Sequence, residues 1–273
     1  MHARHWILSA WTAAALVVAS TPAAAQYGAQ PTSDPATGEK YHVELAGIFW
    51  QPTPDIQVSS EGLGIPGSLI DFQDDLGVES EWLYEVRLVL RPGRKHKFHF
   101  DYTPIKYTAS TVLDRPLVFN GILFNTGQAV ETDFDWKVFN LLYEWDFLYR
   151  DRWFVGFLVG AKYNDISATL TSATASEFTK AKGPIPALGG TGRVYFAPNI
   201  SLTGSVTLFD MPDEIAEDWN GDMYDVDVYG TINFTNNFGV IAGYRSFEID
   251  YRVDLDAGRV DMAGWYVGGA VRF

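Results

Sequence analysis

Apolar and polar residues alternate with a period of two along much of the chain, most clearly in residues 200–208. There the even-numbered positions Ile200, Leu202, Val206 and Leu208 are apolar, whereas the odd-numbered positions hold serine or threonine. Successive side chains of a β-strand point to opposite faces. The pattern therefore predicts a strand whose two faces meet different solvents.

Ten segments with this alternation predict ten strands, each with about the 9–11 residues that a tilted strand needs to cross a bilayer. They begin near residues 41, 82, 97, 139, 153, 188, 200, 225, 240 and 265. Eight or twelve strands are the alternatives, because residues 105–133 are ambiguous. The apolar parity is expected to face outward, which in the first segment places Tyr41 outward and His42 inward.

Short and long connections alternate between these segments. The short ones are residues 91–94, 148–151, 197–199 and 235–237. The long ones are residues 51–79, 111–133, 168–186, 209–223 and 251–260. Tight turns at one end and long loops at the other are typical of an antiparallel membrane barrel.

Composition alone suggests a soluble protein, since 47% of the residues are hydrophobic. After residue 25 the sequence has no run of the roughly 18 apolar residues that a transmembrane helix needs. In hydrocarbon every backbone polar group must be paired, so membrane strands must close into a barrel. We therefore predict an all-β fold, a closed antiparallel up-and-down barrel. A secreted or periplasmic β-sandwich would also alternate, but it would not need Trp and Tyr in nearly every strand.

The last residues carry the most specific pattern. Trp265, Val267, Val271 and Phe273 share one parity, and the sequence stops on Phe273. In this it resembles bacterial outer-membrane β-barrel proteins, whose final strand usually ends in an aromatic residue that the barrel assembly machinery recognises. The resemblance covers residues 41–273 by architecture but only about the last nine by motif. It implies periplasmic turns, external loops and these four residues as an assembly signal.

The first 25 residues have a basic start at Arg4, an apolar stretch and the small residues Ala23–Ala25, which predicts a secretory signal peptide cut before Gln26. Residues 26–40 are rich in Gly, Pro, Ser and Thr and are interpreted as a flexible lead-in to a barrel domain at 41–273. The absence of Cys excludes disulfides, thiolate metal sites and a Cys nucleophile.

Charged residues of both signs fall on the inward parity, and we predict that they form a lumen charge network. They are Glu44, Glu85, Arg87, Glu144, Asp146, Lys162, Arg193, Asp225, Asp227, Arg245 and Arg272. An unpaired charge in a narrow lumen is costly, so a salt-bridged plug is expected. A narrow path for small or cationic solutes is the alternative.

The net charge of −14 becomes −15 after signal cleavage and argues against nucleic acid as a partner. Twelve acidic residues lie in two of the long connections: Asp55, Glu61, Asp71, Asp74, Asp75, Glu79, Asp210, Asp213, Glu214, Glu217, Asp218 and Asp222. Such loops suit divalent cations shared with lipopolysaccharide. Asp218, Asn220, Asp222 and Asp225 are weak cation candidates, because the spacing and the closing Glu of a calcium loop are lacking.

A catalytic role is the least favoured interpretation. Barrel hydrolases such as the omptin-type proteases and the lipid A deacylases use a His near the outer rim, whereas His42, His96 and His99 are expected at the turn end. Asp225 and Asp227 share a face, but such pairs more often form salt bridges. The sequence thus predicts a non-catalytic outer-membrane barrel with a structural or surface-interaction role and no cofactor. Its expected partners are outer-membrane lipid, lipopolysaccharide and the assembly machinery; a hydrolase is the second alternative.

Overall fold

The computed structural model describes residues 36–59, 65–210, 219–253 and 256–273. The predicted signal peptide lies outside them and stays a prediction. Contacts divide the chain into Met1–Asp34 and Pro35–Phe273, and every described residue belongs to the second unit. Within the described part, no helix is long and apolar enough to span a membrane.

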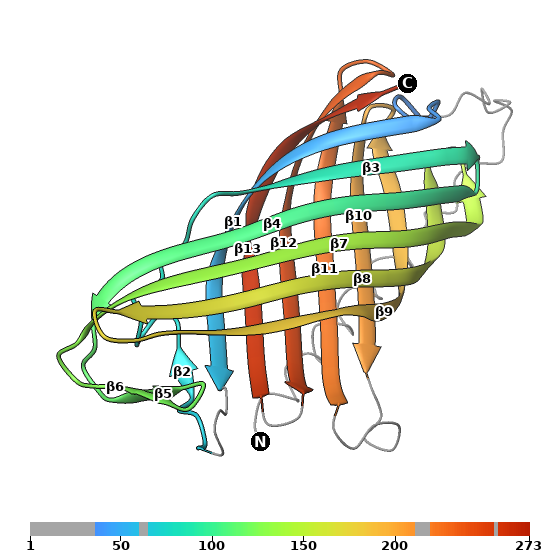
Figure 1. The fold of residues 1–273 in the computed structure, drawn as a ribbon. Helices are drawn as coiled ribbons and strands as arrows, with labels where there is room; N and C mark the ends of the chain where they lie inside the picture. The colour runs from blue at the N-terminus through green and yellow to red at the C-terminus, as the bar shows by residue number, and fades with distance from the viewer. Residues whose placement is uncertain (1–35, 60–64, 211–218, 254–255) are drawn as a thin grey trace, which may run out of the picture. The chain divides into compact units, whose positions relative to one another are not determined.

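Ten long strands form one antiparallel sheet that closes on itself, because β1 also pairs with β13 from Glu44↔Arg272 to Ser59↔Ala257 (Figure 1). The barrel strands are β1 (Val43–Ser59), β3 (Leu83–Gly93), β4 (His96–Val112), β7 (Ala129–Arg150), β8 (Trp153–Ser172), β9 (Ser176–Ala197), β10 (Ile200–Asp210), β11 (Trp219–Asn233), β12 (Phe238–Val253) and β13 (Asp256–Arg272). The predicted fold class and strand number are confirmed.

Three short strands lie at the end of the barrel opposite to the C-terminus (Figure 1). β2 (Ile70–Asp71) pairs with β1, and β5 (Leu117–Phe119) forms a hairpin with β6 (Ile122–Phe124). The four predicted tight turns join β3–β4, β7–β8, β9–β10 and β11–β12 at the other end.

Two of the predicted long loops, 168–186 and 251–260, are largely wrong, because most of their residues continue the strands. The expected loop at 168–186 shrinks to a turn between Ser172 and Ser176, and β7 and β9 each have 22 residues. The ambiguous residues 105–133 hold the end of β4, the β5–β6 hairpin and the start of β7.

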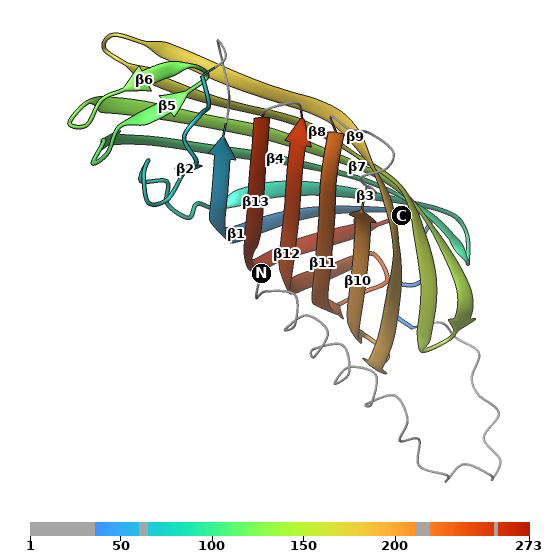
Figure 2. The ribbon, with the colours of Figure 1, turned by 90° about the horizontal axis from the view of Figure 1, so that it is seen from below.

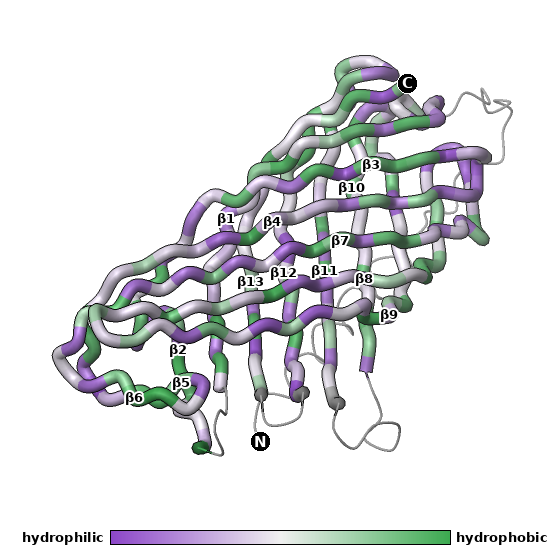
Figure 3. The backbone as a smooth tube through the Cα atoms, in the orientation of Figure 1, coloured by the Kyte–Doolittle hydropathy of each residue, from purple (hydrophilic) through white to green (hydrophobic). Residues whose placement is uncertain are grey.

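The reason is visible on β7, where the alternation inverts partway along the strand. From Phe139 to Trp145 the outward residues are apolar, and the inward ones include Asn140 and Glu144. From Glu131 to Lys137 the outward residues are charged, and the inward ones include Phe134 and Trp136, which have 0% exposure. A search for strands whose apolar residues face outward therefore finds β7 only from Phe139 onward, although the strand begins at Ala129. Figure 3 shows the alternating hydropathy along the strands.

The same inversion divides the whole barrel into two sections. In the belt section, outward apolar side chains form a continuous apolar belt. It comprises Leu45, Phe49, Tyr84, Val86, Leu90, Phe98, Phe100, Phe139, Leu141, Trp145, Trp153, Val155, Phe157, Val159, Leu188, Val194, Phe196, Ile200, Leu202, Leu208, Val226, Val228, Ile232, Phe238, Tyr244, Trp265, Val267, Val271 and Phe273. Beyond it, the strands continue as an extension with outward residues such as Asp55, Asp165 and Lys182.

The extension has an apolar interior of its own, like the inside of a soluble β-barrel. Its buried residues, the extension core, are Ile56, Val58, Ile70, Phe72, Leu76, Phe119, Phe124, Val130, Phe134, Trp136, Ile166, Leu170, Met223, Phe247, Ile249, Val260 and Met262. β2 and the β5–β6 hairpin supply part of this core, and the ring of Phe72 meets that of Phe134 edge-on at 5.5 Å. Figure 2 shows the barrel strands from a second direction.

One predicted orientation is wrong at the start of β1. Tyr41 is 7% exposed and lies inside the barrel, whereas His42 is exposed. The pair lies just before β1, and the period of two need not hold outside a strand. The Nδ1 atom of His42 lies 3.1 Å from the carbonyl oxygen of Arg91.

Candidate functional site: a charge network across the lumen

The structure places all eleven residues of the expected lumen network on the inner wall of the belt section, ten of them buried and Arg87 half-buried. They contact one another through ion pairs that cross between strands. The pairs fall into four groups, each of which includes residues that the network prediction did not contain.

The central group runs across the lumen from β8 to β3. Arg245 on β12 donates from Nε and Nη2 to the two oxygens of Asp225 on β11 at 2.9 and 2.8 Å, and from Nη1 to Glu85 on β3 at 2.6 Å. Lys162 on β8 also pairs with Asp225. Asp225 is therefore neutralised by two buried cations.

Arg87 extends this group toward β13. It pairs with Glu85 and lies 3.0 Å from Asp227, which accepts a hydrogen bond of 2.6 Å from the hydroxyl of Tyr266. The guanidinium of Arg87 also lies over the ring of Tyr266, 5.1 Å from its centroid. Asp225 and Asp227 thus share a face as expected but serve separate cations.

A second group lies near the tight turns. Lys97 on β4 pairs with Glu144 and, at 2.9 Å, with Asp146, both on β7. The Nε2 atom of His99 lies 2.7 Å from the second oxygen of Glu144. Lys97 and His99 have the inward parity of the predicted strand, although the network prediction left them out.

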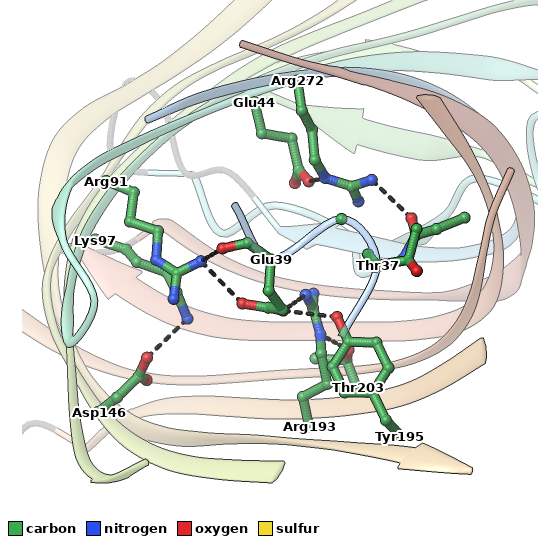
Figure 4. A network of polar contacts seen from close by, with 12 residues as sticks. Thr37, Glu39, Glu44, Arg91, Lys97, Asp146, Arg193, Tyr195, Thr203 and Arg272 are labelled. Atoms are coloured by element: carbon green, nitrogen blue, oxygen red, sulfur yellow. Dashed lines mark hydrogen bonds and ion pairs between the residues drawn. The ribbon is translucent and has the colours of Figure 1, made fainter. Parts of the chain in front are cut away.

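The third group is built around Glu39, which comes from the segment interpreted as a flexible lead-in. Residues 36–40 enter the barrel, and the carboxylate of Glu39 lies between two strands (Figure 4). It accepts hydrogen bonds from Arg91 at 2.8 Å, from Arg193 at 2.9 Å and from the Tyr195 hydroxyl at 2.6 Å. Nothing in the composition of the segment marks Glu39 as a lumen residue. Arg91 was assigned to a turn, but it continues the parity of Arg87.

The fourth group closes the seam between the first and last strands. Arg272 on β13 pairs with Glu44 on β1, and its Nη1 donates to Asn233 at 2.7 Å. The side chain of Asn233 in turn donates to the carbonyl oxygen of Thr37 at 2.7 Å. The N-terminal segment is therefore bonded to two of the four groups.

Between these groups a cavity of about 110 Å³ remains, lined by the network residues. Its charged and polar lining and its volume suit ordered water molecules. Above it, the inward positions of the barrel hold the buried apolar side chains of the extension core. In the described residues, the charged cavity and the packed core lie in succession along the barrel axis.

Part of the negative charge in the acidic connection 51–79 is neutralised by an arginine from another connection. The carboxylate of Asp75 accepts a hydrogen bond of 2.7 Å from Nε of Arg115 and one of 2.9 Å from the backbone N–H of Asp71. Arg115 lies between β4 and β5. Burial raises the pKa of Asp75, but these hydrogen bonds outweigh it and lower the pKa below its ordinary value. Glu61 and residues 213–218 lie outside the described residues.

The two weak cation candidates whose side chains the structure describes, Asp222 and Asp225, do not converge. Asp225 faces the lumen and is held by Lys162 and Arg245. Asp222 has the outward parity and lies opposite Asp250 in the β11–β12 register. Asp218 lies outside the described residues, as does the side chain of Asn220. In the described part of the chain, no three His, Asp or Glu residues are grouped so as to hold a metal ion.

The three histidines lie at the tight-turn end, where the sequence placed them. His96 begins β4, directly after the β3–β4 turn, and His42 precedes β1. At the same end, Val267, Val271 and Phe273 face outward with exposures of 52, 40 and 70%, and Trp265 on the same face is 72% exposed. The backbone of Phe273 bonds to that of Val43, which fixes the last residue against the first strand.

Solved structures provide the comparison, since no protein-family model and no curated protein matches the sequence. The outer-membrane protease OmpT of Escherichia coli superposes with a TM-score of 0.61 at 10% identity, covering 89% of this chain and all of OmpT. The fold is that of the bacterial outer-membrane β-barrels. Two further structures are more distant. The translocator domain of the autotransporter NalP from Neisseria meningitidis has a TM-score of 0.40 at 9% identity, covering 98% of this chain and 97% of its own. OprG from Pseudomonas aeruginosa has a TM-score of 0.38 at 11% identity, covering 86% of this chain and 99% of its own. At these identities the likeness shows the fold alone.

Proposed function

We propose that the protein is an integral, non-catalytic outer-membrane barrel that conducts no solutes and acts in a structural or surface-interaction role through its extension. One observation carries the proposal: the buried apolar side chains of the extension core pack inside the barrel above the charge network, with a cavity left beside β9. Side chains such as Ile56, Phe134 and Leu170 have 0% exposure there. Barrels of about eight to ten strands have interiors that side chains can fill, whereas porins with water-filled channels have sixteen or more.

The proposal includes the orientation in the membrane. On β7 the outward apolar residues run from Phe139 to Phe147, which fits the about 9–11 residues of a membrane-spanning strand. The predicted signal peptide would deliver the chain to the periplasm. The tight turns then lie in the periplasm, and the extension projects from the cell. Its charged outer face and the Asp75–Arg115 region are the parts available to lipopolysaccharide or an external partner.

Conductance of refolded protein in a planar bilayer tests the closed lumen. We expect no discrete current steps, while a water-filled porin reconstituted in parallel gives them. Steps in the wild type would overturn the proposal in favour of a narrow channel. Membrane fractionation with heat-modifiable gel migration tests the location, and recovery of the protein as a soluble periplasmic species would contradict it.

A further inference from the structure

A second cavity, of about 280 Å³, lies inside the extension beside β9. Its walls come mainly from β8 and β9, with residues of β1, β7 and β12 completing them. An apolar cavity of about 150 Å³ is enough to bind benzene or xenon. The volume in the extension therefore admits a molecule with one aromatic ring or two fused rings.

The cavity exists because β9 has small inward residues where its neighbours have large ones. Thr179, Ala181 and Gly183 line it on β9, while Phe134 on β7 and Ile166 on β8 line it at the same level. Ala181 lies directly opposite Ile166 in the β8–β9 register. The hollow thus follows from the sequence of one strand.

The lining suits an uncharged apolar ligand. Val58, Ile166 and Ile249 present buried aliphatic side chains. The amide of Asn164 is already engaged, since its oxygen accepts from Trp136 Nε1 and its nitrogen donates to the carbonyl oxygen of Lys162, both at 3.1 Å. A polar ligand would find this amide occupied, whereas an apolar one needs no hydrogen bond.

The two lysines beside the cavity do not change this. Lys180 and Lys182 belong to the outward parity of β9 and are exposed. Lys182 pairs with Asp165 at 2.7 Å, and Lys180 lies 5.2 Å from the ring centroid of Phe178. Both lysines line the cavity together with Gly183 and Pro184, and their exposure shows that this side of the cavity meets water.

The cavity borders a gap in the strand pairing. Residues 176–187 of β9 pair with β8 alone, because the pairing with β10 begins at Leu188↔Leu208. Figure 1 shows β9 following β8 away from β10. Pro184 and Pro186 lie in this edge segment, where missing N–H groups disfavour the addition of another strand. The edge is thus unsuited to pairing but leaves a lateral approach to the cavity.

We propose that this cavity binds small uncharged apolar molecules, of the class of monocyclic aromatic hydrocarbons, which enter from the outer aqueous side past the unpaired edge of β9. The site lies above the apolar belt, so its ligand comes from solution and not from the bilayer. Binding here does not depend on whether the lumen conducts, and the two proposals fail separately.

Single cysteines provide the test, because the chain has no Cys. Ala181→Cys in lipid nanodiscs reacts with a water-soluble maleimide, and we expect saturating p-xylene to slow this reaction several-fold. Phe178→Cys, on the outward face of the same strand and outside the lining of the cavity, should react at an unchanged rate. Equal rates for Ala181→Cys with and without p-xylene, or equal slowing of both variants, would overturn the proposal.

Stability measurements give an independent readout. A ligand that binds only the folded state stabilises it by mass action, so p-xylene should raise the urea midpoint of the wild type and of Glu131→Phe, whose new ring lies on the outer face away from the cavity. It should not raise that of Ala181→Phe, in which the ring fills the cavity. If Ala181→Cys is protected in nanodiscs without p-xylene but reactive in amphipol, the occupant is a lipid chain and the proposal is wrong.

Discussion

The belt section and the extension are made by the same ten strands, yet they bury opposite chemistry. Inside the belt, inward positions hold paired charges such as Arg245 and Asp225. Inside the extension, they hold apolar side chains such as Phe134 and Leu170. The proposed membrane location accounts for the difference, because residues facing lipid must be apolar and residues facing water need not be.

The comparison also explains why charges are retained inside the belt. Paired buried charges contribute little net stability, since desolvation offsets their attraction. They do, however, keep every membrane strand polar on one face. A strand apolar on both faces would be prone to aggregate while still unfolded. We infer that the network serves delivery and specificity more than stability.

The largest expected effect is in the belt section. Arg245→Leu leaves the buried carboxylates of Asp225 and Glu85 with one cation each, and breaking such a pair costs about 3–5 kcal/mol. Urea unfolding in detergent measures it. The matched variant Arg259→Leu, whose ion pair with Glu248 is exposed, should cost at most about 1 kcal/mol. Equal losses would mean that the network residues are solvated.

In the extension, a cavity-forming change should cost nearly as much. Phe134→Ala removes a ring with 0% exposure, and such changes cost about 3–5 kcal/mol. Unfolding monitored by tryptophan fluorescence gives the value, with exposed Phe178→Ala as control. A loss below that of the control would show that the extension core is not packed.

The outer faces should differ in their tolerance of charge. Leu141→Lys places a charge on the belt, where the cost is about 2–4 kcal/mol at mid-bilayer. Glu131→Lys, on the outward face of the same strand in the extension, should be nearly neutral. Refolding yield into vesicles and urea midpoints compare the two, and similar penalties would remove the boundary between the sections.

The smallest effect is electrostatic. Asp261 lies between Asp55 and Glu248 in the sheet register. Burial raises the pKa of Asp261, Arg259 opposes this shift, and the negative charges of Asp55 and Asp250 raise the pKa further. A carboxyl group with a raised folded pKa binds its proton better in the folded state, so its contribution to stability grows as pH falls through that pKa. Asp261→Asn should therefore stabilise the barrel at pH 7 by about 0.5 kcal/mol.

The pH dependence distinguishes this cause from a packing change. As pH falls through the raised pKa of Asp261 and the group becomes protonated, the gain from Asp261→Asn should disappear. Asp151→Asn, in the exposed β7–β8 turn, serves as control and should have no effect at neutral or low pH. A gain that persists at low pH would contradict the electrostatic origin.

The belt section could be predicted from the sequence, and the extension could not. Outward Leu141 and inward Glu144 satisfy a pattern of apolar-out alternation, so ten strands and most network residues followed from it. Inward Phe134 between outward Asp133 and Asp135 has the same period with opposite polarity, and it lies between the predicted connection 111–133 and the strand predicted from residue 139. The inversion itself is the signal that would have found it.

Other features depend on contacts that no local pattern contains. Glu39 enters the lumen because Arg91 and Arg193, far along the chain, meet there. Arg115 neutralises Asp75 across two connections. The cavity beside β9 requires knowledge of which strands lie opposite its small residues. Only tertiary structure supplies these relations.

Reactivity of single cysteines along the outward face of β7 tests the inversion most directly. Cysteines replacing Glu131, Asp133 and Asp135 should react rapidly with a water-soluble maleimide in lipid nanodiscs, whereas those replacing Phe139, Leu141 and Tyr143 should resist it. When the latter three cysteines carry a bilayer-permeant fluorescent label, a lipid-soluble quencher should reduce its fluorescence. A sharp change between residues 135 and 139 is the expected result. Lipid exposure of the cysteine at position 133, or water exposure of that at position 141, would contradict the division of the barrel into a belt section and an extension.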